Sequence, residues 1–295
     1  MTLSDQVRAT CGQIAATARS VRIDLDALET LEPGPLPELD AERHYLEGEP
    51  EAVARYMLAL DAINFGSGWF PTLRKRRGLD GTAVSGYFTV AWGLADRFRA
   101  LGPWSNAELR GMRTEEIADV LGQARDHELM ALFAQALRQL GVFLGDRSAL
   151  DAVAAAEGSA VRLAEQLASG MTMFSDPGFY KRAQIAGSDL QLAGVATFHD
   201  IDRLSIFADN LVPHVLRCDG VLVYDERLAA HIDAGRMLRP GPQEREIRAC
   251  AVHACALIAQ RTGMSERDID NALWTRGGAP EYKALPRHRC RTIFY

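Results

Sequence analysis

The sequence predicts a mainly helical protein with one small β element, and three observations support this prediction. Apolar residues recur at helical spacing over most of the chain, as they do on the buried face of a helix. Strict alternation of apolar and polar residues, which is typical of strands, is confined to short stretches. The chain has 295 residues, of which 47% are apolar, so it can bury a large core.

The first 32 residues form a helical segment that precedes the main domain. Val7, Cys11 and Ile14 share one face of the expected helix, and residues 21–24 then alternate. The Pro-Gly-Pro-Leu-Pro run at residues 33–37 breaks any helix and is the clearest linker in the chain. We therefore expect an N-terminal helical segment, residues 1–32, followed by a single helical domain, residues 38–295.

Helical spacing also defines the elements after residue 50. Pro50 suits the first turn of a helix, whose buried face then includes Val53 and Met57. Further helices are expected to begin near Thr114, Leu129, Ser148, Lys181, Glu244 and Ser265. Residues 221–224 and 291–295 alternate as strands do, and we expect these two stretches to pair.

Composition and charge narrow the class of partner. The net charge is −6 and no extended basic footprint exists, which counts against duplex nucleic acid and favours a small-molecule substrate. No run of eighteen apolar residues and no secretion signal are found, so we expect a cytoplasmic protein without a membrane partner. The five cysteines lack metal-ligand spacing and are interpreted as reduced core thiols. We expect neither a metal nor a cofactor.

The segment from Phe207 to Arg217 is the strongest candidate for chemistry. Val212 and Val215 follow Asp209 at helical spacing, so they point into a core and leave Asp209 at the entrance of the helix. An aspartate in this position often only caps the helix. Both interpretations, a cap and a catalytic carboxylate, remain open at this point.

Two further stretches have the composition of a nucleotide site. Phe65 and Trp69 are separated by glycines and offer flat surfaces for a base, although they also suit a helix end packed under aromatics. Residues 74–77 are four consecutive cations, which either attract a monophosphate or lie in a solvated loop. His44 lies in an acidic surround, and alone it indicates little.

Six blocks occur in order along the chain, at residues 61–65, 179–185, 207–209, 220–224, 244–249 and 286–295. Together they resemble the queuosine salvage protein family. The match covers most of the chain from about His44 onward. In addition, the pattern Asp-x-x-Val-x-x-Val-Leu-Arg-x-x-Gly from Asp209 is similar to the catalytic segment of helix-hairpin-helix DNA glycosylases. The resemblance therefore implies a helical fold related to that of DNA glycosylases.

The same resemblance implies hydrolysis of queuosine 5′-monophosphate to queuine, a 7-deazaguanine base, and ribose 5-phosphate, which allows queuine to be reused in tRNA. By position, Asp209 matches the catalytic aspartate, Phe207 a base-contacting aromatic and His44 a pocket residue. A carboxylate suits this reaction because it stabilises the oxocarbenium ion, adds to the sugar, or orients water. Lys181, Arg182 and His44 are the candidates to assist the leaving base, with Lys181 preferred.

The sequence departs from the family in two places. Residues 64–70 read Asn-Phe-Gly-Ser-Gly-Trp-Phe where animal members have Asn-Phe-x-Phe-Trp. After Trp274, which we expect to contact the base, Thr275 stands where some members carry acidic and tyrosyl residues. A carboxylate is the natural partner for the N1–H and 2-amino edge of a guanine-like base. Asp200, Asp202 and Glu281 are the candidates to replace it, with Asp200 preferred.

Two other functions remain as alternatives. A base-excision DNA glycosylase is favoured by the Asp209 segment, but it is opposed by the acidic charge and by the absence of a Leu-Pro-Gly-Val-Gly hairpin between Asp189 and Asp209. A helical protein that binds a modified nucleotide or tRNA without catalysis would use Asp209 only as a cap.

Overall fold

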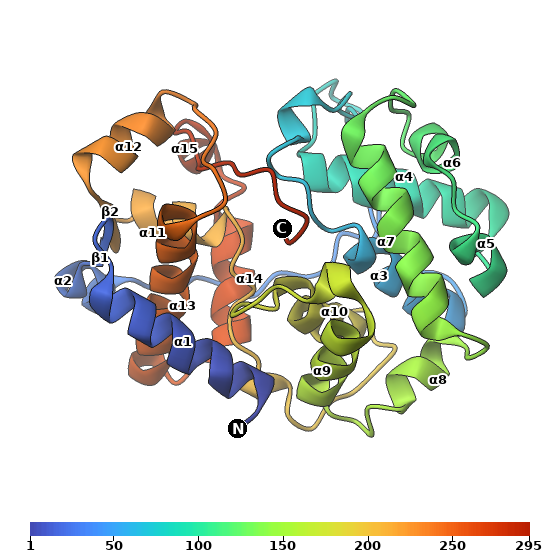
Figure 1. The fold of residues 1–295 in the computed structure, drawn as a ribbon, viewed down its shortest axis with the longest axis horizontal. Coiled ribbons are helices and arrows are strands. Elements are labelled where there is room, and N and C mark those ends of the chain that lie inside the picture. Colours follow the sequence, from blue (N-terminus) through green and yellow to red (C-terminus); the bar gives the residue numbers. More distant parts are fainter.

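The computed structural model describes residues 1–295, and most of them lie in helices (Figure 1). The α-helices are α1 (Leu3–Thr17), α2 (Leu25–Thr30), α3 (Pro50–Ala62), α4 (Gly86–Leu101), α5 (Asn106–Arg110), α6 (Thr114–Val120), α7 (Glu128–Leu144), α8 (Ala149–Ala154), α9 (Ala160–Gly170), α10 (Lys181–Leu192), α11 (Val212–Cys218), α12 (Glu226–Asp233), α13 (Pro242–Thr262), α14 (Glu266–Arg276) and α15 (Pro280–Lys283). Short 3-10 turns occur at Phe70–Thr72, Thr172–Phe174 and Ile201–Arg203. The predicted mainly helical fold is confirmed.

One small antiparallel sheet joins β1 (Val21–Ile23) to β2 (Leu222–Tyr224). The strand expected at residues 221–224 is therefore present, but the expected pairing with residues 291–295 is wrong. Those residues form no strand, because their backbone groups bond elsewhere. Arg182, for example, donates to the carbonyl oxygen of Ile293 at 2.8 Å. The partner strand is instead β1, from the N-terminal segment of the chain.

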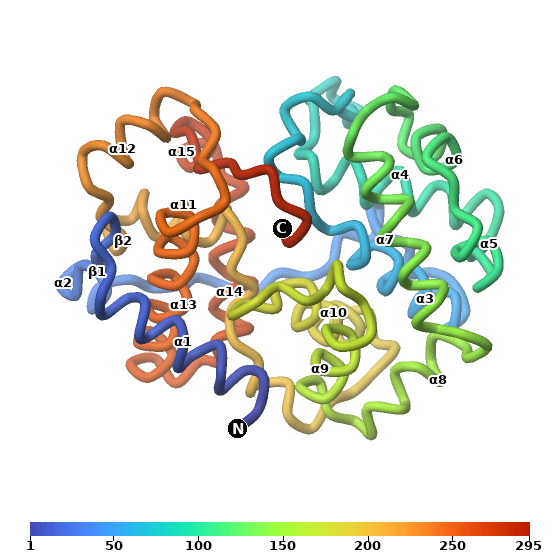
Figure 2. Tube along the Cα trace, viewed as in Figure 1, coloured from blue at the N-terminus to red at the C-terminus, as the bar shows by residue number.

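The last ten residues, 286–295, form a tail that lies in the middle of the molecule (Figure 2). Helices α11 and α14 lie on one side of the tail, and α3 and α7 lie on the other (Figure 2). Gly66, whose φ is +103°, donates its N–H to the carbonyl oxygen of Tyr295 at 2.9 Å. A Cβ at Gly68 would lie 2.4 Å from the carbonyl oxygen of Cys290. Gly66 therefore binds the end of the tail, and the missing side chain of Gly68 lets the tail approach the loop after α3.

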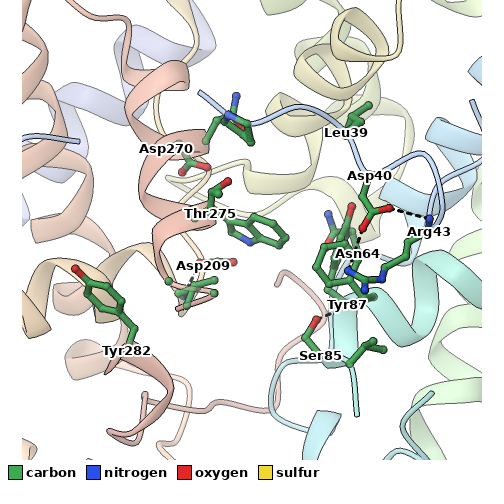
Figure 3. Close-up of a pocket in the computed structure, with 18 of the residues that line it drawn as sticks. Leu39, Asp40, Arg43, Asn64, Ser85, Tyr87, Asp209, Asp270, Thr275 and Tyr282 are labelled. Atoms are coloured by element: carbon green, nitrogen blue, oxygen red, sulfur yellow. Dashed lines mark hydrogen bonds and ion pairs between the residues drawn. The ribbon is translucent and has the colours of Figure 1, made fainter. Parts of the chain in front are cut away.

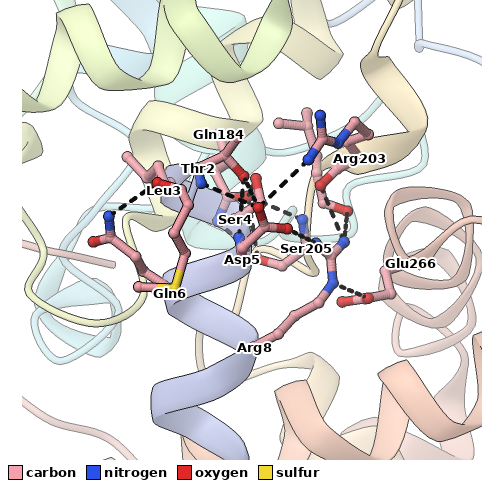
Figure 4. A network of polar contacts seen from close by, with 12 residues as sticks. Thr2, Leu3, Ser4, Asp5, Gln6, Arg8, Gln184, Arg203, Ser205 and Glu266 are labelled. Carbon is pink, nitrogen blue, oxygen red and sulfur yellow. Dashed lines mark hydrogen bonds and ion pairs between the residues drawn. The ribbon is translucent and has the colours of Figure 1, made fainter.

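The N-terminal segment packs on helices from the end of the chain. Helix α1 lies along α13 and buries Val7 and Cys11 completely. Figure 4 shows the polar contacts of its first turns, where Arg8 bonds Glu266 of α14 and Ser4 lies 3.3 Å from Gln184 of α10. The division of the chain into residues 1–32 and 38–295 stays a prediction.

The helices share one continuous apolar core, to which α3, α7, α10 and α13 contribute buried faces. Ser148 caps α8 through a capping box with Asp151, as expected from the sequence. All five cysteines are free, and only Cys218 is not fully buried. None of the helices is long and apolar enough to cross a membrane.

Candidate active site

A cavity of about 640 Å³ opens beside the C-terminal tail (Figure 3). Its lining comes from the loop at residues 37–44, the loop at 78–85 with the first turn of α4, one face of α10, the segment that leads into α11, helix α14, and residues 275–287. Figure 3 shows Asp209 and Asp270 on one side of this cavity, opposite Asp40, Arg43 and Tyr87. Segments from the whole length of the chain therefore build one site.

Asp209 lies two residues before Leu211, the N-cap residue of α11, where it binds the first N–H groups and faces the cavity. Its Oδ1 atom accepts the N–H of Leu211 at 2.6 Å and the N–H of Val212 at 3.3 Å. These bonds fix the carboxylate at the start of the helix, where Pro213 follows in the first turn. The Oδ2 atom has no partner within the protein and is available to a ligand in the cavity. A structural role at the start of the helix and a role as a catalytic carboxylate, the two interpretations from the sequence, are therefore compatible.

Lys181 supplies the positive charge next to Asp209. It is the first residue of α10 and follows Tyr180, which has a left-handed φ of +51°. The side chain is 4% exposed, and its Nζ donates to the carbonyl oxygen of Asn64 at 3.1 Å. Burial lowers the pKa of Lys181, whereas the charges of Asp209 and Asp61 oppose this shift.

Asp61 and Asp189 form a buried carboxyl pair close to Lys181. Neither oxygen of Asp61 is exposed or hydrogen-bonded, while Asp189 of α10 lines the cavity. Burial raises the pKa of Asp189 to about 6, and burial together with the charge of Asp189 raises the pKa of Asp61 well above its ordinary value. The raised pKa of Asp61 favours its protonated form, which lessens the repulsion between the two carboxyl groups.

Asp270, on α14, is a further carboxyl in this cluster. Its side chain is 3% exposed, and its Oδ1 accepts the N–H of Phe207 at 2.8 Å. Burial, and then the charge of Asp209, raise its pKa to about 8. The hydrogen bond also holds the backbone that leads to Asp209.

His44 lines the cavity from the opposite side and is neutral. Its Nδ1 lies 2.9 Å from the carbonyl oxygen of Asp40, which can only accept, so Nδ1 carries the hydrogen. Nε2 therefore accepts the hydroxyl hydrogen of Tyr87, also at 2.9 Å. Burial lowers the pKa of His44. The imidazole thus positions Tyr87 at the cavity.

Aromatic side chains provide flat walls for the cavity. Phe207 and Trp274, both expected to contact a base, line it together with Tyr87 and Phe88. The Trp274 ring packs edge-on against Tyr87 and Phe88, with centroid distances of 5.4 and 5.9 Å. The cavity therefore combines aromatic surfaces with polar groups, as sites for planar polar ligands do.

Phe65, Trp69 and Arg182 lie outside the cavity, contrary to the sequence prediction. Phe65 is 1% exposed and packs edge-on against Phe133, with ring centroids 5.1 Å apart. Arg182 lies 4.6 Å from the Phe65 ring and donates to the carbonyl oxygens of Ala62, Met173 and Ile293. Trp69 is 4% exposed, and its indole donates to Glu128 at 2.7 Å. These side chains stabilise the core and the tail.

The acids expected to contact the base edge also lie elsewhere. Asp200 accepts hydrogen bonds from the Ser159 hydroxyl at 2.6 Å and from the Ala160 N–H at 2.7 Å, and so supports the start of α9, which Ser159 caps. Asp202 and Glu281 are exposed and outside the cavity. Asp200 bonds residues about forty positions earlier in the chain, so only the fold reveals its structural role.

The basic run at residues 74–77 does not line the cavity. Arg76 forms an ion pair with Asp96 and lies 4.5 Å from the Trp92 ring centroid. Arg287 from the tail lines the cavity instead, and no acidic side chain forms an ion pair with it. Burial, and then the charge of Arg287, lower the pKa of Lys75 to about 8.

Asp270, Arg287 and Tyr87 were not predicted as site residues. Asp270 had a usable signal, because it precedes Trp274 by four residues and so shares its helix face. Arg287 lies within a block of the family resemblance, but that block contains three arginines and nothing local distinguishes them. No group of three or more His, Cys, Asp or Glu side chains is arranged to hold a metal ion.

The fold and the cavity define a helical protein with a pocket for a small, flat and polar ligand. The family model described as queuosine salvage protein matches residues 43–295, so the chain belongs to the queuosine salvage protein family. A relative from Sphaerobacter thermophilus is 32% identical over 98% of this chain and 97% of its own length. Relatives from Mus musculus and Dictyostelium discoideum are 26% and 38% identical, over 84% and 40% of this chain and 83% and 40% of their own lengths. All three are named queuosine 5′-phosphate N-glycosylase/hydrolase.

Proposed function

We propose that the protein hydrolyses the N-glycosidic bond of queuosine 5′-phosphate and releases queuine and ribose 5-phosphate. Membership of the family supports the substrate class. The observation that carries the chemistry is a carboxylate with one oxygen tied to backbone N–H groups and the other facing a cavity, namely Asp209. Such a carboxylate can stabilise positive charge on a sugar without moving during the reaction.

Each part of the substrate has a matching part of the cavity. The planar base lies against Trp274 and Phe207, and the sugar lies beside Asp209. As the bond to the base breaks, the sugar becomes an oxocarbenium ion, which the Asp209 carboxylate stabilises or captures. Lys181 brings a positive charge close enough to interact with the charge of Asp209.

The phosphate binds at Arg287. No acidic side chain forms an ion pair with its guanidinium, and its charge acts on Lys75, which lies outside the cavity. The charge of Asp209 acts on Arg287, but no side chain bonds the guanidinium, which suits phosphate geometry. This placement replaces the basic run at residues 74–77 as the candidate phosphate site.

Chromatography of the products tests the reaction. Purified protein is incubated with queuosine 5′-phosphate, with queuosine and guanosine 5′-phosphate in parallel. We expect free queuine from the first substrate, and we expect Asp209→Asn to lower kcat at least about 100-fold. Asp202→Asn is the matched control, because Asp202 is an exposed carboxyl outside the cavity. A folded Asp209→Asn protein with unchanged turnover would exclude a catalytic role for Asp209.

The phosphate contact has its own test. Arg287→Gln should raise KM for queuosine 5′-phosphate about 10-fold or more, since a lost charge-assisted hydrogen bond costs about 1.5–3 kcal/mol. KM for queuosine, which lacks the phosphate, should change little. Arg76→Gln is the matched control, because Arg76 is engaged by Asp96. Equal changes for both substrates in Arg287→Gln would reject the assignment.

A further inference from the structure

We propose that Asp270 donates the proton that lets the base leave, so that Asp209 and Asp270 divide stabilisation of the sugar and protonation of the base between them. This inference rests on the proposed function and deepens it. The base of queuosine is a 7-deazapurine and lacks the N7 nitrogen at which guanine ordinarily accepts a proton on leaving. Proton donation must therefore reach another atom of the base, and it needs a donor inside the cavity.

The position of Asp270 meets this need. Its Oδ1 is occupied by the Phe207 N–H at 2.8 Å, whereas no protein group bonds Oδ2. The residue lines the cavity from α14, one helical turn before Trp274, against which the base is placed. Figure 3 shows Asp270 and Asp209 on the same side of the cavity. A substrate in contact with Asp209 and Trp274 thus lies within reach of Asp270.

The other candidate donors are engaged elsewhere. His44 has its only hydrogen on Nδ1, where it bonds the Asp40 carbonyl oxygen, and Nε2 accepts from Tyr87. Arg182 lies outside the cavity and bonds three carbonyl oxygens. Lys181 donates to the Asn64 carbonyl oxygen, and its charge attracts that of Asp209, so loss of its proton would remove this attraction.

The surroundings of Asp270 keep it protonated near neutral pH. The charged and titratable groups that face it are Asp209, Lys181 and Asp189, together with Cys255 of α13. Burial raises its pKa most, Asp209 and Asp189 add to this, and the Phe207 N–H and Lys181 oppose it, with a result of about 8. An acid with this pKa is protonated at pH 7 and can still transfer its proton.

The step balances with water as the only co-reactant. The bond between the sugar C1′ and the base nitrogen breaks, and its electron pair goes to the base. The Oδ2 proton of Asp270 passes to the base, which leaves neutral, while Asp209 stabilises the oxocarbenium ion. Water then forms the new C–O bond at C1′, and its released proton returns to Asp270.

A substrate with a better leaving group isolates this role. 4-Nitrophenyl riboside 5-phosphate needs no proton to release nitrophenolate, but it forms the same oxocarbenium ion. Asp270→Asn keeps an oxygen for the Phe207 N–H and should lower kcat for queuosine 5′-phosphate about 100-fold or more, with less than about a 3-fold change for the nitrophenyl substrate. Asp209→Asn, the matched comparison, should lose turnover of both substrates.

The pH profile of the unmodified protein gives a second test that needs no variant. The kcat for queuosine 5′-phosphate should fall as pH rises above about 8, because Asp270 then loses its proton. The kcat for the nitrophenyl substrate should not show this alkaline fall.

The outcomes separate the two proposals. If Asp270→Asn lowers kcat equally for both substrates, or if kcat for both substrates falls at alkaline pH, the role of Asp270 is overturned and the proposed function stays intact. Full activity of Asp270→Asn on queuosine 5′-phosphate does the same. If the unmodified, folded protein leaves queuosine 5′-phosphate intact, the proposed function fails, and the role of Asp270 fails with it.

Discussion

Arg248 shows how one side chain positions the candidate site without facing the cavity. Its guanidinium bonds Asp176 and Glu244, and its Nε donates to the carbonyl oxygen of Ala208 at 2.9 Å. Burial opposes its charge, but the charge of Asp176 and their hydrogen bond hold the pKa of Arg248 above its ordinary value. The backbone immediately before Asp209 is thereby fixed to α13.

Removal of Asp176 should therefore be costly. Asp176→Ala leaves the Arg248 charge buried without its main partner, which we expect to lower the free energy of unfolding by about 3–5 kcal/mol. Urea denaturation measures the change. Asp119→Ala is the matched control, because Asp119 and Arg125 form an exposed ion pair, and it should cost less than about 1 kcal/mol. Similar losses in both variants would contradict the structural role of Arg248.

Asp270 should also make stability depend on pH. Its pKa of about 8 in the folded protein exceeds the value of an unfolded aspartate, about 3.9. Between these values the folded state holds a proton that the unfolded state has lost, so the free energy of unfolding falls as pH rises. Asp270→Asn removes this dependence. Urea midpoints should therefore decrease more in the unmodified protein than in the variant between about pH 5 and pH 8. Parallel decreases would contradict the raised pKa.

At the scale of elements, the C-terminal tail and the loop after α3 are joined backbone to backbone. A Cβ at Gly68 would lie 2.4 Å from the Cys290 carbonyl oxygen, and backbone cannot give way as a side chain can. Gly68→Ala should therefore displace the tail and lower the free energy of unfolding by about 1–3 kcal/mol. It should also raise KM for the phosphate substrate, because Arg287 belongs to the tail.

A second glycine provides the control for this prediction. Gly12 lies within α1, and a Cβ there would meet only His253 Nδ1 at 3.6 Å, an ordinary contact. Gly12→Ala should stabilise the protein by about 0.5–1 kcal/mol, since alanine has the higher helix propensity. Thermal unfolding of both variants measures the two changes, which should have opposite signs.

Helices were the part of the fold that the sequence predicted well. Buried faces of α1, α3, α7 and α13 follow from spacing within single segments, so no distant residue is needed to recognise them. The partner of β2 could not be predicted locally, because Val21–Ile23 lies far away in the chain. Asp270 was missed for a related reason. It lies on a helix face with apolar residues, and other segments of the chain form the cavity that it lines.

At the scale of the whole molecule, the N-terminal segment is held to helices from the end of the chain by α1, β1 and Arg8. Deletion of residues 1–32 would expose the apolar surface of α13 to water. We expect the fragment 33–295 to aggregate or to lose cooperative unfolding, as measured by gel filtration and circular dichroism. A monomeric, fully active fragment would instead support the predicted boundary at residues 33–37 as a domain limit.

The pairing of β1 with β2 also has a consequence for the order of events in folding. Closing a loop between residues 21 and 224 is entropically costly, and contacts between residues so far apart form late and slowly. The cavity also depends on contacts between residues that are far apart in the chain, because its lining runs from residue 37 to residue 287. Most of the helices can form before the cavity exists. In a refolding experiment, the helical signal therefore returns first and substrate turnover returns last.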